Sequence, residues 1–460
     1  MIRPGNSDTA GSAATGEAAE LALFVDLYEL TMPQAYLEEG LTADAVFMLF
    51  VRRLPKGRNH LLACGLDTVL DYLERLRFSD EALAYLASLG RFSGRFLSWL
   101  SDFRFTGDVY ALPEGTPFFA DEPILEVVAP LPQAQLVETL VMNQIHLQTL
   151  LASKAQRVVT AAAGRPVVDF GARRMHGIDA ALKGARALFI GGAAATSNML
   201  AGQRYGLPVA GTMAHSYIQA HDDEADALRA FVRLYPKATL LVDTYDTLAG
   251  VRKVIALARE LGRDFKVAAV RLDSGDLLAL SRQTRRLLDD AGLEKVEIFA
   301  SGGLNESSIA ALVAAGAPID GFGVGAGMGV SDDAPTLDIA YKLCEYAGRG
   351  RLKLSEGKPV LPGRKQVFRV AEGDRDVRDV IARSSEESPG RPLLVKMMEH
   401  GVRLPVARVE LTAIRAYAGE QTARLPEAVR GLRAPEAPYR VDVSTALADL
   451  QARVAAQVAV

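Results

Sequence analysis

Cysteine and histidine are scarce in this chain of 460 residues, which has two of the first and six of the second. Cys64 and Cys344 lie far apart and form no CxxC pair, so the sequence indicates neither a disulfide framework nor a cysteine zinc site. No apolar run approaches the roughly 20 residues that a membrane-spanning helix needs. We therefore expect a cytoplasmic protein without a membrane partner.

An excess of positive charge is also missing, because the formal net charge is −4. Binding to nucleic acid usually requires a basic surface, so we expect no nucleic-acid partner. Any phosphate must then be bound locally by a few residues. The hydrophobic share of 49% and charged share of 23% are typical of a globular protein, and the length predicts at least two domains.

Changes in sequence pattern divide the chain into four predicted segments. Residues 1–20 are small and polar, which predicts a disordered tail. Residues 21–150 combine an apolar strand, small antiparallel strands and a long or broken helix, which predicts an N-terminal α/β domain with a helical linker. Residues 151–345 form the predicted barrel, and residues 346–460 are expected to pack on the N-terminal domain and end in a helix.

A repeated pattern begins near residue 165, where short apolar runs end in polar loops and several are followed by a helix-like segment. The runs are PVVDFGARR, ALFIGG, LPVAGTMAHS, ATLLVDTYD, KVAAVRLDSGD, VEIFASGG and IDGFGVGAG. Alternation of strand and helix predicts a parallel sheet, and this number of runs favours an irregular TIM-like α/β barrel. The fold class is then α/β, with an open N-terminal α/β domain completed by C-terminal segments. Polar residues that follow the strands would meet at one mouth of the barrel.

Glycines and arginines gather at these predicted strand ends. Gly302, Gly323 and Gly325 either form tight turns or let a phosphate approach the backbone. Arg173, Arg174 and Arg271 lie at predicted strand ends, and guanidinium groups bind anions in a bidentate manner. The combination suggests a ligand that carries several phosphates.

Two pairs of aspartates follow the runs in VDTYD and RLDSGD. Carboxylates at this place either hold a hydrated magnesium ion against phosphates or cap the following helix. We expect one aspartate of each pair to be a cap. The metal ligands themselves stay unassigned.

His215 lies among small residues in GTMAHS, directly after a predicted strand. Metal ligation is disfavoured because no further histidine or cysteine stands at ligand spacing, His221 being six residues on. A buried structural histidine, a general base and a nucleophile all remain open from the residues alone.

Longer blocks resemble one family. DLYELTMPQAY, DFGARRMHG, TSNMLAGQRYGLPVAGTMAHS, LLVDTYDT, VRLDSGDL and KLSEGKPVLPGRKQVFR occur in that order between about residues 24 and 370. They are similar to the blocks of nicotinate phosphoribosyltransferases, which are type II phosphoribosyltransferases.

The resemblance implies an ATP-dependent enzyme of NAD salvage. It would join nicotinate to 5-phosphoribosyl 1-diphosphate, giving nicotinate mononucleotide and diphosphate, with ATP hydrolysis coupled through a phosphohistidine. It implies Mg2+ as cofactor, ATP as co-substrate, and a homodimer with active sites shared between subunits.

The family's catalytic roles fall on residues of the matching blocks. The resemblance implies that His215 is the phosphorylated histidine, and we hypothesise that Asp243 orients its ring. Tyr28 would stack on the pyridine ring from the partner subunit, with Phe170 on the other face.

Other matching positions would bind substrate. The resemblance places Arg173, Thr212 and Arg271 on nicotinate or the developing product, and Asp273 on ribose or magnesium. Asn198 stands where relatives that use nicotinamide carry an aspartate, and a neutral residue suits an anionic carboxylate.

The sequence also departs from the family pattern. Gly303 replaces an acidic residue or asparagine, Ala326 replaces a threonine at the phosphate-binding strand end, and residues 193–195 are alanines within GGAAATSN. These changes raise two alternatives: a phosphoribosyltransferase that uses nicotinamide, quinolinate or another pyridine, and a divergent binding paralogue of low activity.

Overall fold

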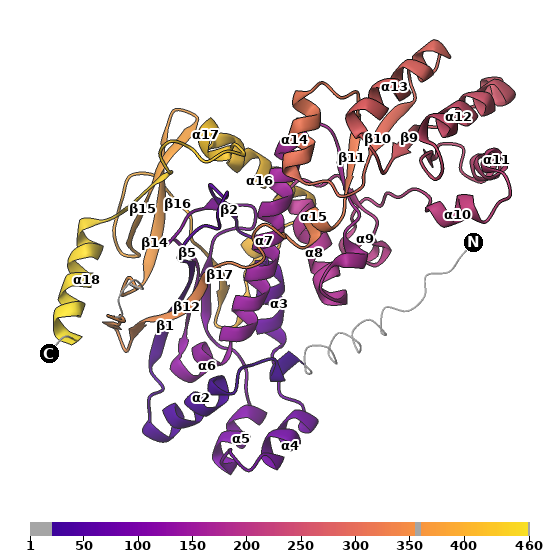
Figure 1. Cartoon of the computed structure of the whole chain (residues 1–460). Coiled ribbons are helices and arrows are strands. Elements are labelled where there is room, and N and C mark those ends of the chain that lie inside the picture. Colours follow the sequence, from indigo (N-terminus) through magenta and orange to yellow (C-terminus); the bar gives the residue numbers. More distant parts are fainter. Residues whose placement is uncertain (1–20, 355–359, 459–460) are drawn as a thin grey trace. The chain divides into compact units, whose positions relative to one another are not determined.

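The computed structural model describes residues 21–354 and 360–458 (Figure 1). Of these, the residues up to Thr149 and from Thr336 onward form one compact unit, unit 1. Leu150–Pro335 form the other, unit 2. Within the described ranges, no helix combines the length and apolar character needed to cross a membrane.

Unit 1 is built on a seven-stranded antiparallel sheet with the order β13-β12-β1-β5-β3-β17-β18. The strands are β1 Asp44–Val51, β3 Asp108–Ala111, β5 Pro123–Pro130, β12 Ile339–Tyr346, β13 Arg349–Gly350, β17 Val395–Glu399 and β18 Val402–Arg403. β1 lies between β12 and β5, and all of its residues after Asp44 are buried. The continuous apolar run that predicted this strand reflects cover on both of its faces.

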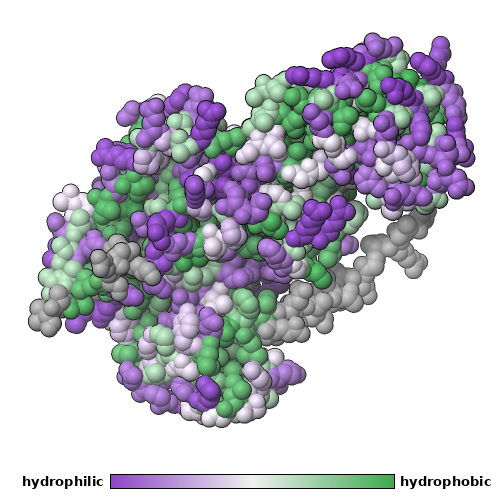
Figure 2. Space-filling view, viewed as in Figure 1, coloured by the Kyte–Doolittle hydropathy of each residue, from purple (hydrophilic) through white to green (hydrophobic). Residues whose placement is uncertain are grey.

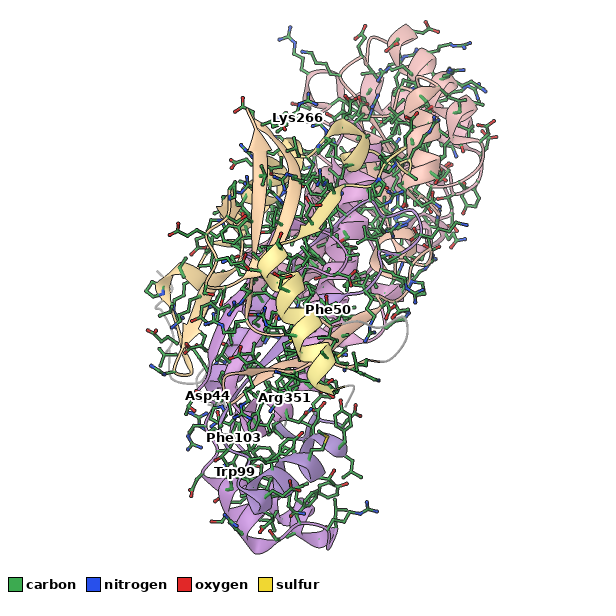
Figure 3. All side chains as sticks on the ribbon, turned by 90° about the vertical axis from the view of Figure 1, so that its left-hand side faces the viewer. Asp44, Phe50, Trp99, Phe103, Lys266 and Arg351 are labelled. Carbon is green, nitrogen blue, oxygen red and sulfur yellow. The ribbon has the colours of Figure 1, made fainter. Side chains whose placement is uncertain are left out.

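Unit 1 also contains helices, and the long or broken helix expected before the barrel corresponds to α6 and α7. The helices are α2 Tyr28–Glu39, α3 Leu66–Arg75, α4 Asp80–Ser88, α5 Gly94–Ser101, α6 Leu131–Leu136 and α7 Glu138–Ala161, which starts in unit 1 and ends in unit 2. The only tryptophan, Trp99 in α5, packs edge-on against Phe103 with ring centroids 5.2 Å apart (Figure 3).

C-terminal strands complete unit 1 with a second sheet of order β16-β14-β15-β19. The bounds are β14 Lys365–Glu372, β15 Arg375–Arg383, β16 Arg391–Pro392 and β19 Arg440–Val443; a separate pair joins β2 Leu61–Leu62 to β4 Pro117–Phe118. The remaining helices are α16 Leu411–Arg424, α17 Glu427–Arg430 and α18 Thr445–Val458. The expected completion of the N-terminal fold by C-terminal segments is confirmed, as Figure 1 shows for β14 beside β5.

Unit 2 contains a curled parallel sheet of six strands with the order β7-β6-β11-β10-β9-β8. They are β6 Val167–Asp169, β7 Ala195–Thr196, β8 Thr239–Leu241, β9 Ala269–Leu272, β10 Glu297–Ala300 and β11 Gly321–Val324. β7 and β8 are the edges, so the sheet is an open half-barrel. This confirms the irregular TIM-like fold.

Helices follow these strands: α8 Ile178–Ile190, α9 Met199–Tyr205, α10 His215–Gln219, α11 Glu224–Leu234, α12 Thr247–Leu261, α13 Leu277–Asp290, α14 Glu306–Ala314 and α15 Ala326–Gly329. Figure 2 shows hydrophilic residues over the outer side of α11, α12 and α13. That distribution is expected of helices that bury one face against a parallel sheet.

Two of the seven predicted strands are wrong. ALFIGG contains the end of α8, whose residues 184–190 are all buried. A short apolar run before glycine fits a buried helix as well as a strand, and the helix prevails here. LPVAGTMAHS contributes only an isolated bridge between Thr196 and Val209, because Pro208 cannot donate to a ladder.

Candidate active site

The carboxyl ends of β6, β9, β10 and β11 surround a pocket of about 260 Å³. Its lining consists of Phe170, Arg173, Arg174, Arg271, Asp273, Ser301, Gly302, Gly303, Leu304, Asn305, Gly323, Gly325, Ala326, Gly327 and Asp332. Seven of the predicted site residues are among them. The pocket therefore lies where the barrel pattern placed the mouth.

Arg271, near the end of β9, connects most of the polar groups. Its guanidinium donates to Ser301 Oγ and Thr212 Oγ1 at 2.7 Å each and to Asp273 Oδ1 at 2.5 Å. The guanidinium carbon also lies 5.3 Å from the centre of the Phe170 ring. These contacts hold a cation and an aromatic face side by side, an arrangement suited to a planar anionic ring.

Asp273 is an ionised carboxylate in this arrangement. Burial alone would raise its pKa, but hydrogen bonds from Ser301 and Arg271 and the charge of Arg271 lower the pKa below its usual range. The carboxylate therefore presents a fixed negative charge beside His215, whose Nε2 lies 3.8 Å from Asp273 Oδ2.

His215 is the first residue of α10, and its ring is 41% exposed. This exposure argues against the reading of His215 as a core histidine. Nδ1 lies 3.1 Å from Thr244 Oγ1, which holds the ring in one orientation. The other ring nitrogen, Nε2, is the one near Asp273.

Asp243, at the end of β8, has a different environment from the one expected. Its Oδ2 accepts hydrogen bonds from Asp273 N at 2.8 Å and Ser274 Oγ at 2.7 Å. The bond to the His215 ring thus comes from Thr244 rather than Asp243 in the described structure. Oδ1 of Asp243 is buried and has no hydrogen-bond partner among the described residues.

The other aspartate of each pair is a helix cap, as expected. Asp246 accepts from Ala249 N at the start of α12, and Asp276 accepts from Ala279 N at the start of α13. The structure thus separates one capping aspartate from one aspartate at the strand end in both pairs.

Arg173 and Arg174 form the exposed edge of the pocket. Both lie in a short 3-10 helix, Ala172–Arg174, directly after β6. Neither side chain makes a hydrogen bond or ion pair with another described residue, unlike that of Arg271. Two cations without a counter-ion beside a pocket are available to an anionic ligand.

The strand-end glycines serve close packing as well as the pocket. A Cβ on Gly302, which has φ +91°, would lie 1.8 Å from Asp273 O, and one on Gly323 would lie 2.4 Å from Phe170 Cε2. Gly325 has more room, with Phe170 O as the nearest atom at 3.3 Å. Gly302 therefore lies in a tight turn, Gly323 lies within β11 and leaves room for the Phe170 ring, and all three glycines also line the pocket.

Asn198 and Tyr28 are not brought to the pocket wall. Asn198 caps α9 by accepting from Ala201 N, and its amide donates to Ala181 O at 3.3 Å. Tyr28 lies in unit 1, at the start of α2, and is 41% exposed. Thr212 also lies off the lining but reaches the site through Arg271.

Sequence reasoning missed Thr244 and Ser301, which complete the hydrogen bonds of the site. Each belongs to a strand-end motif that was recognised, VDTYD for Thr244 and FASGG for Ser301. Their position directly after a predicted strand was the available signal.

A magnesium ion fits the donors at this mouth. The described residues contain no cluster of three or more His, Cys, Asp and Glu side chains that could hold a metal. Mg2+ does not need such a cage, because it commonly takes one or two carboxylates together with substrate phosphates. Asp273 and the unpartnered Oδ1 of Asp243 supply oxygens of that kind.

Two family models match the chain. Residues 23–146 match the N-terminal domain of nicotinate phosphoribosyltransferase, and residues 151–342 match the C-terminal domain of quinolinate phosphoribosyl transferase.

Relatives and solved structures agree with this match over nearly the whole chain. A nicotinate phosphoribosyltransferase of Mycobacterium tuberculosis is 55% identical over 94% of both chains, and one of Bacillus subtilis is 39% identical over 76% of this chain and 73% of its own. The crystal structure of human nicotinic acid phosphoribosyltransferase superposes with a TM-score of 0.84 at 28% identity, covering 93% of this chain and 99% of its own. A nicotinate-nucleotide pyrophosphorylase of Pyrococcus furiosus gives a TM-score of 0.72 at 25% identity, covering 92% and 99%. The chain belongs to the nicotinate phosphoribosyltransferase family.

Proposed function

We propose that the protein joins nicotinate to 5-phosphoribosyl 1-diphosphate, forming nicotinate mononucleotide and diphosphate for NAD salvage. The observation that carries this proposal is the pocket in which two unpaired arginines face strand-end glycines beside the Phe170–Arg271 pair. The named relatives, which match over nearly the whole chain, support the same reaction.

The phosphoribosyl substrate would bind between Arg173, Arg174 and the glycine-rich loops at 302–303 and 325–327. Departure of diphosphate leaves oxocarbenium character on the sugar and negative charge on the leaving group. Arginines that carry no other ion pair stabilise that charge as it develops. The ring nitrogen of nicotinate then forms the new bond to the anomeric carbon.

Nicotinate would lie on the Phe170 ring with its carboxylate towards Arg271, which is already oriented by Thr212 and Ser301. Asn198 would favour nicotinate because a neutral side chain suits an anionic carboxylate. The amide of Asn198 is itself held by its contacts at the start of α9 and with Ala181 O. Asp243 would act indirectly, by holding the backbone of Asp273.

Magnesium would be held by Asp273 and Asp243 together with substrate phosphates, and it would neutralise the charge of the diphosphate. The chain's own contribution is to keep Asp273 ionised through Ser301 and Arg271.

ATP coupling would proceed through His215. Nε2 attacks the γ-phosphorus, the bond to the bridging oxygen of ADP breaks, and ADP leaves with that electron pair. Water later hydrolyses the phosphohistidine to phosphate. The hydrogen bond at Nδ1 supports this role, because a proton held between Nδ1 and Thr244 leaves the Nε2 lone pair free.

A homodimer with shared sites is supported by exposed apolar side chains in both units. Leu27 and Tyr28 are 48% and 41% exposed in unit 1, and Ile178 and Met199 are 78% and 69% exposed in unit 2. Large exposed apolar side chains are candidates for burial in a protein interface. We propose that a second copy covers them and brings its Tyr28 to the pyridine ring.

The direct test is product formation from 5-phosphoribosyl 1-diphosphate with nicotinate, nicotinamide or quinolinate, with and without ATP. We expect nicotinate mononucleotide from nicotinate and a higher yield with ATP. Equal turnover of nicotinamide would contradict the role given to Asn198. Absence of any mononucleotide would overturn the proposal.

The phosphohistidine is tested with γ-labelled ATP. Wild type should acquire an acid-labile, base-stable label that His215→Ala lacks. Tyr28→Ala should lose turnover and His215→Ala should lose the stimulation by ATP, whereas a mixture refolded or coexpressed as heterodimers should regain ATP-stimulated activity at one site per dimer. No recovery in purified heterodimers would argue against sites shared between subunits.

A quinolinate-using enzyme is the second candidate, favoured by the match of residues 151–342 to the quinolinate phosphoribosyl transferase domain. Preferred turnover of quinolinate, with release of carbon dioxide, would establish it. A low-activity paralogue, suggested by Ala326, would be indicated by weak turnover that Ala326→Thr increases.

A further inference from the structure

Lys154 is a buried cation on α7 that has no role in the mechanism proposed above. It is 1% exposed, although lysine is rarely buried unless paired. Its ammonium donates to Glu306 Oε2 at 2.6 Å and to Asp333 Oδ1 at 2.7 Å. Arg157, one helical turn further along α7, donates to Glu306 Oε1 at 3.1 Å. One lysine thus joins two carboxylates from separate parts of unit 2.

The two carboxylates adjoin, along the chain, the segments that form two walls of the pocket. Glu306 is the first residue of α14, and the four residues before it, 302–305, all line the pocket. Asp333 follows Asp332, which lines the pocket together with residues 325–327. Figure 1 shows α14 beside the C-terminal half of α7, consistent with the Lys154–Glu306 bond.

The segments that carry these carboxylates have defined and closely packed backbones. A Cβ on Gly327 would lie 2.4 Å from Leu304 O, so the two walls touch each other. Ser331 has φ +47° and bonds to Ala334 through backbone and side chain, forming a tight turn around Asp333. Such a turn keeps its position only when neighbouring contacts fix it.

We propose that Lys154 is a positioning residue for the phosphoribosyl diphosphate site, fixing both glycine-rich walls and neutralising the carboxylates behind them. This inference rests on the proposed function. A polyanionic substrate approaches a region that contains Glu306 and Asp333, and their charges would repel it. A buried ammonium shared between the two removes that repulsion while it ties the walls to one helix.

The test replaces Lys154 with methionine, which has a similar length and no charge. We expect KM for 5-phosphoribosyl 1-diphosphate to rise about tenfold or more, with kcat changed less than about threefold, because the groups that touch the reacting atoms stay in place. Amide hydrogen exchange should accelerate in residues 303–305 and 331–334. Lys154→Arg, which keeps the charge, should recover part of the loss in KM.

A matched control is Lys253→Met. Lys253 of α12 pairs with the buried Glu224 of α11 at 2.8 Å in the same unit, but neither residue lines the pocket. The control should lower stability and leave KM and exchange at the two walls unchanged. If Lys154→Met matches wild type or behaves like the control in these two readouts, the inference is overturned.

Two further measurements keep the inference separate from folding and from the proposed function. Asp333→Asn retains the Lys154–Glu306 bond, so the variant should fold. Amide exchange should accelerate in residues 331–334 but not in 303–305, and unchanged exchange in 331–334 would count against the inference.

Calorimetric binding of diphosphate does not depend on turnover. Loss of diphosphate affinity in Lys154→Met would support the role of Lys154 even if wild type fails to use nicotinate, whereas unchanged affinity would overturn it.

Discussion

Two groups of charged side chains, one in each unit, have opposite environments. In unit 1, Arg369 and Asp379 are both inaccessible and form a bidentate ion pair, and Lys365 lies 3.2 Å from the equally buried Glu126. In unit 2, Arg173 and Arg174 stand at the pocket edge without a described partner. Charges of the first kind are satisfied by the fold, and those of the second kind are available to a ligand.

The contrast also shows how each unit avoids an unbalanced charge. Glu122 lies near Asp379 and Arg369 in unit 1, and burial followed by the charge of Asp379 raises the pKa of Glu122 well above its usual range. The raised pKa favours the protonated, uncharged form of Glu122 beside the Arg369–Asp379 ion pair. At the mouth of unit 2, hydrogen bonds and Arg271 instead lower the pKa of Asp273 and keep it charged for function.

The largest expected effect comes from breaking the buried pair in unit 1. Arg369→Met leaves Asp379 buried without its cation and should cost about 3–5 kcal/mol of unfolding free energy. Urea denaturation followed by the fluorescence of Trp99, which lies in unit 1, measures this loss. Arg378→Met in the same sheet, which loses a half-exposed pair with Asp442, should cost under about 1 kcal/mol. Equal losses would contradict the distinction between the pairs.

The unpaired arginines of unit 2 should show the reverse behaviour. Arg173→Met should weaken binding of 5-phosphoribosyl 1-diphosphate by about 1.5–3 kcal/mol, because a charge-assisted hydrogen bond to phosphate is lost. Stability should change by less than about 0.5 kcal/mol, since no ion pair is broken. Calorimetric titration and thermal denaturation measure the two effects. Arg233→Met, on the exposed surface of α11, is the matched control and should change neither.

Features of local origin were predictable from the sequence. The buried strand β1 follows from a continuous apolar run, and one capping aspartate in each of the pairs VDTYD and RLDSGD follows from its place before an amphipathic segment. Each depends on residues within one or two turns of chain. The parallel sheet and its polar mouth follow from repetition of the same local pattern.

Features that depend on contacts between distant segments were not predictable. Arg271 meets Thr212 across 59 residues, and Lys154 meets Glu306 across 152. The helix in ALFIGG was missed because burial on all sides removes the periodicity that distinguishes a helix from a strand. The site chemistry beyond its strand-end residues therefore required the three-dimensional arrangement.

An exception within unit 1 offers a smaller test of the comparison. Glu29 of α2 is fully buried and accepts from Thr139 Oγ1 at 2.5 Å, with Tyr28 as its neighbour. Burial, opposed in part by that hydrogen bond, raises the pKa of Glu29 to about 7. The folded state therefore holds a proton that the unfolded chain releases near pH 4.5, and stability falls as pH rises from there to about 7.

Glu29→Gln should abolish this contribution, on the order of 1–2 kcal/mol once solvent screening is allowed for. Unfolding free energies of variant and wild type, compared at pH 5 and pH 8, measure it. Glu39→Gln, at the exposed end of the same helix, should leave the wild-type pH dependence intact. A wild-type stability that does not fall relative to that of Glu29→Gln between pH 5 and pH 8 would contradict the raised pKa of Glu29.

The smallest effect concerns the one hydrogen bond that orients His215. Thr244→Val keeps the shape of the side chain but removes the oxygen 3.1 Å from Nδ1, a loss of about 0.5–1.5 kcal/mol. The rate of labelling by γ-labelled ATP should fall by up to about tenfold, whereas stability should not change, because Thr244 is only partly buried. Thr244→Ser retains the hydroxyl and should label at nearly the wild-type rate. A Thr244→Val protein that labels as fast as wild type would mean that other contacts orient the His215 ring. Thr244 would then not belong to the groups of unit 2 that prepare the site for a ligand.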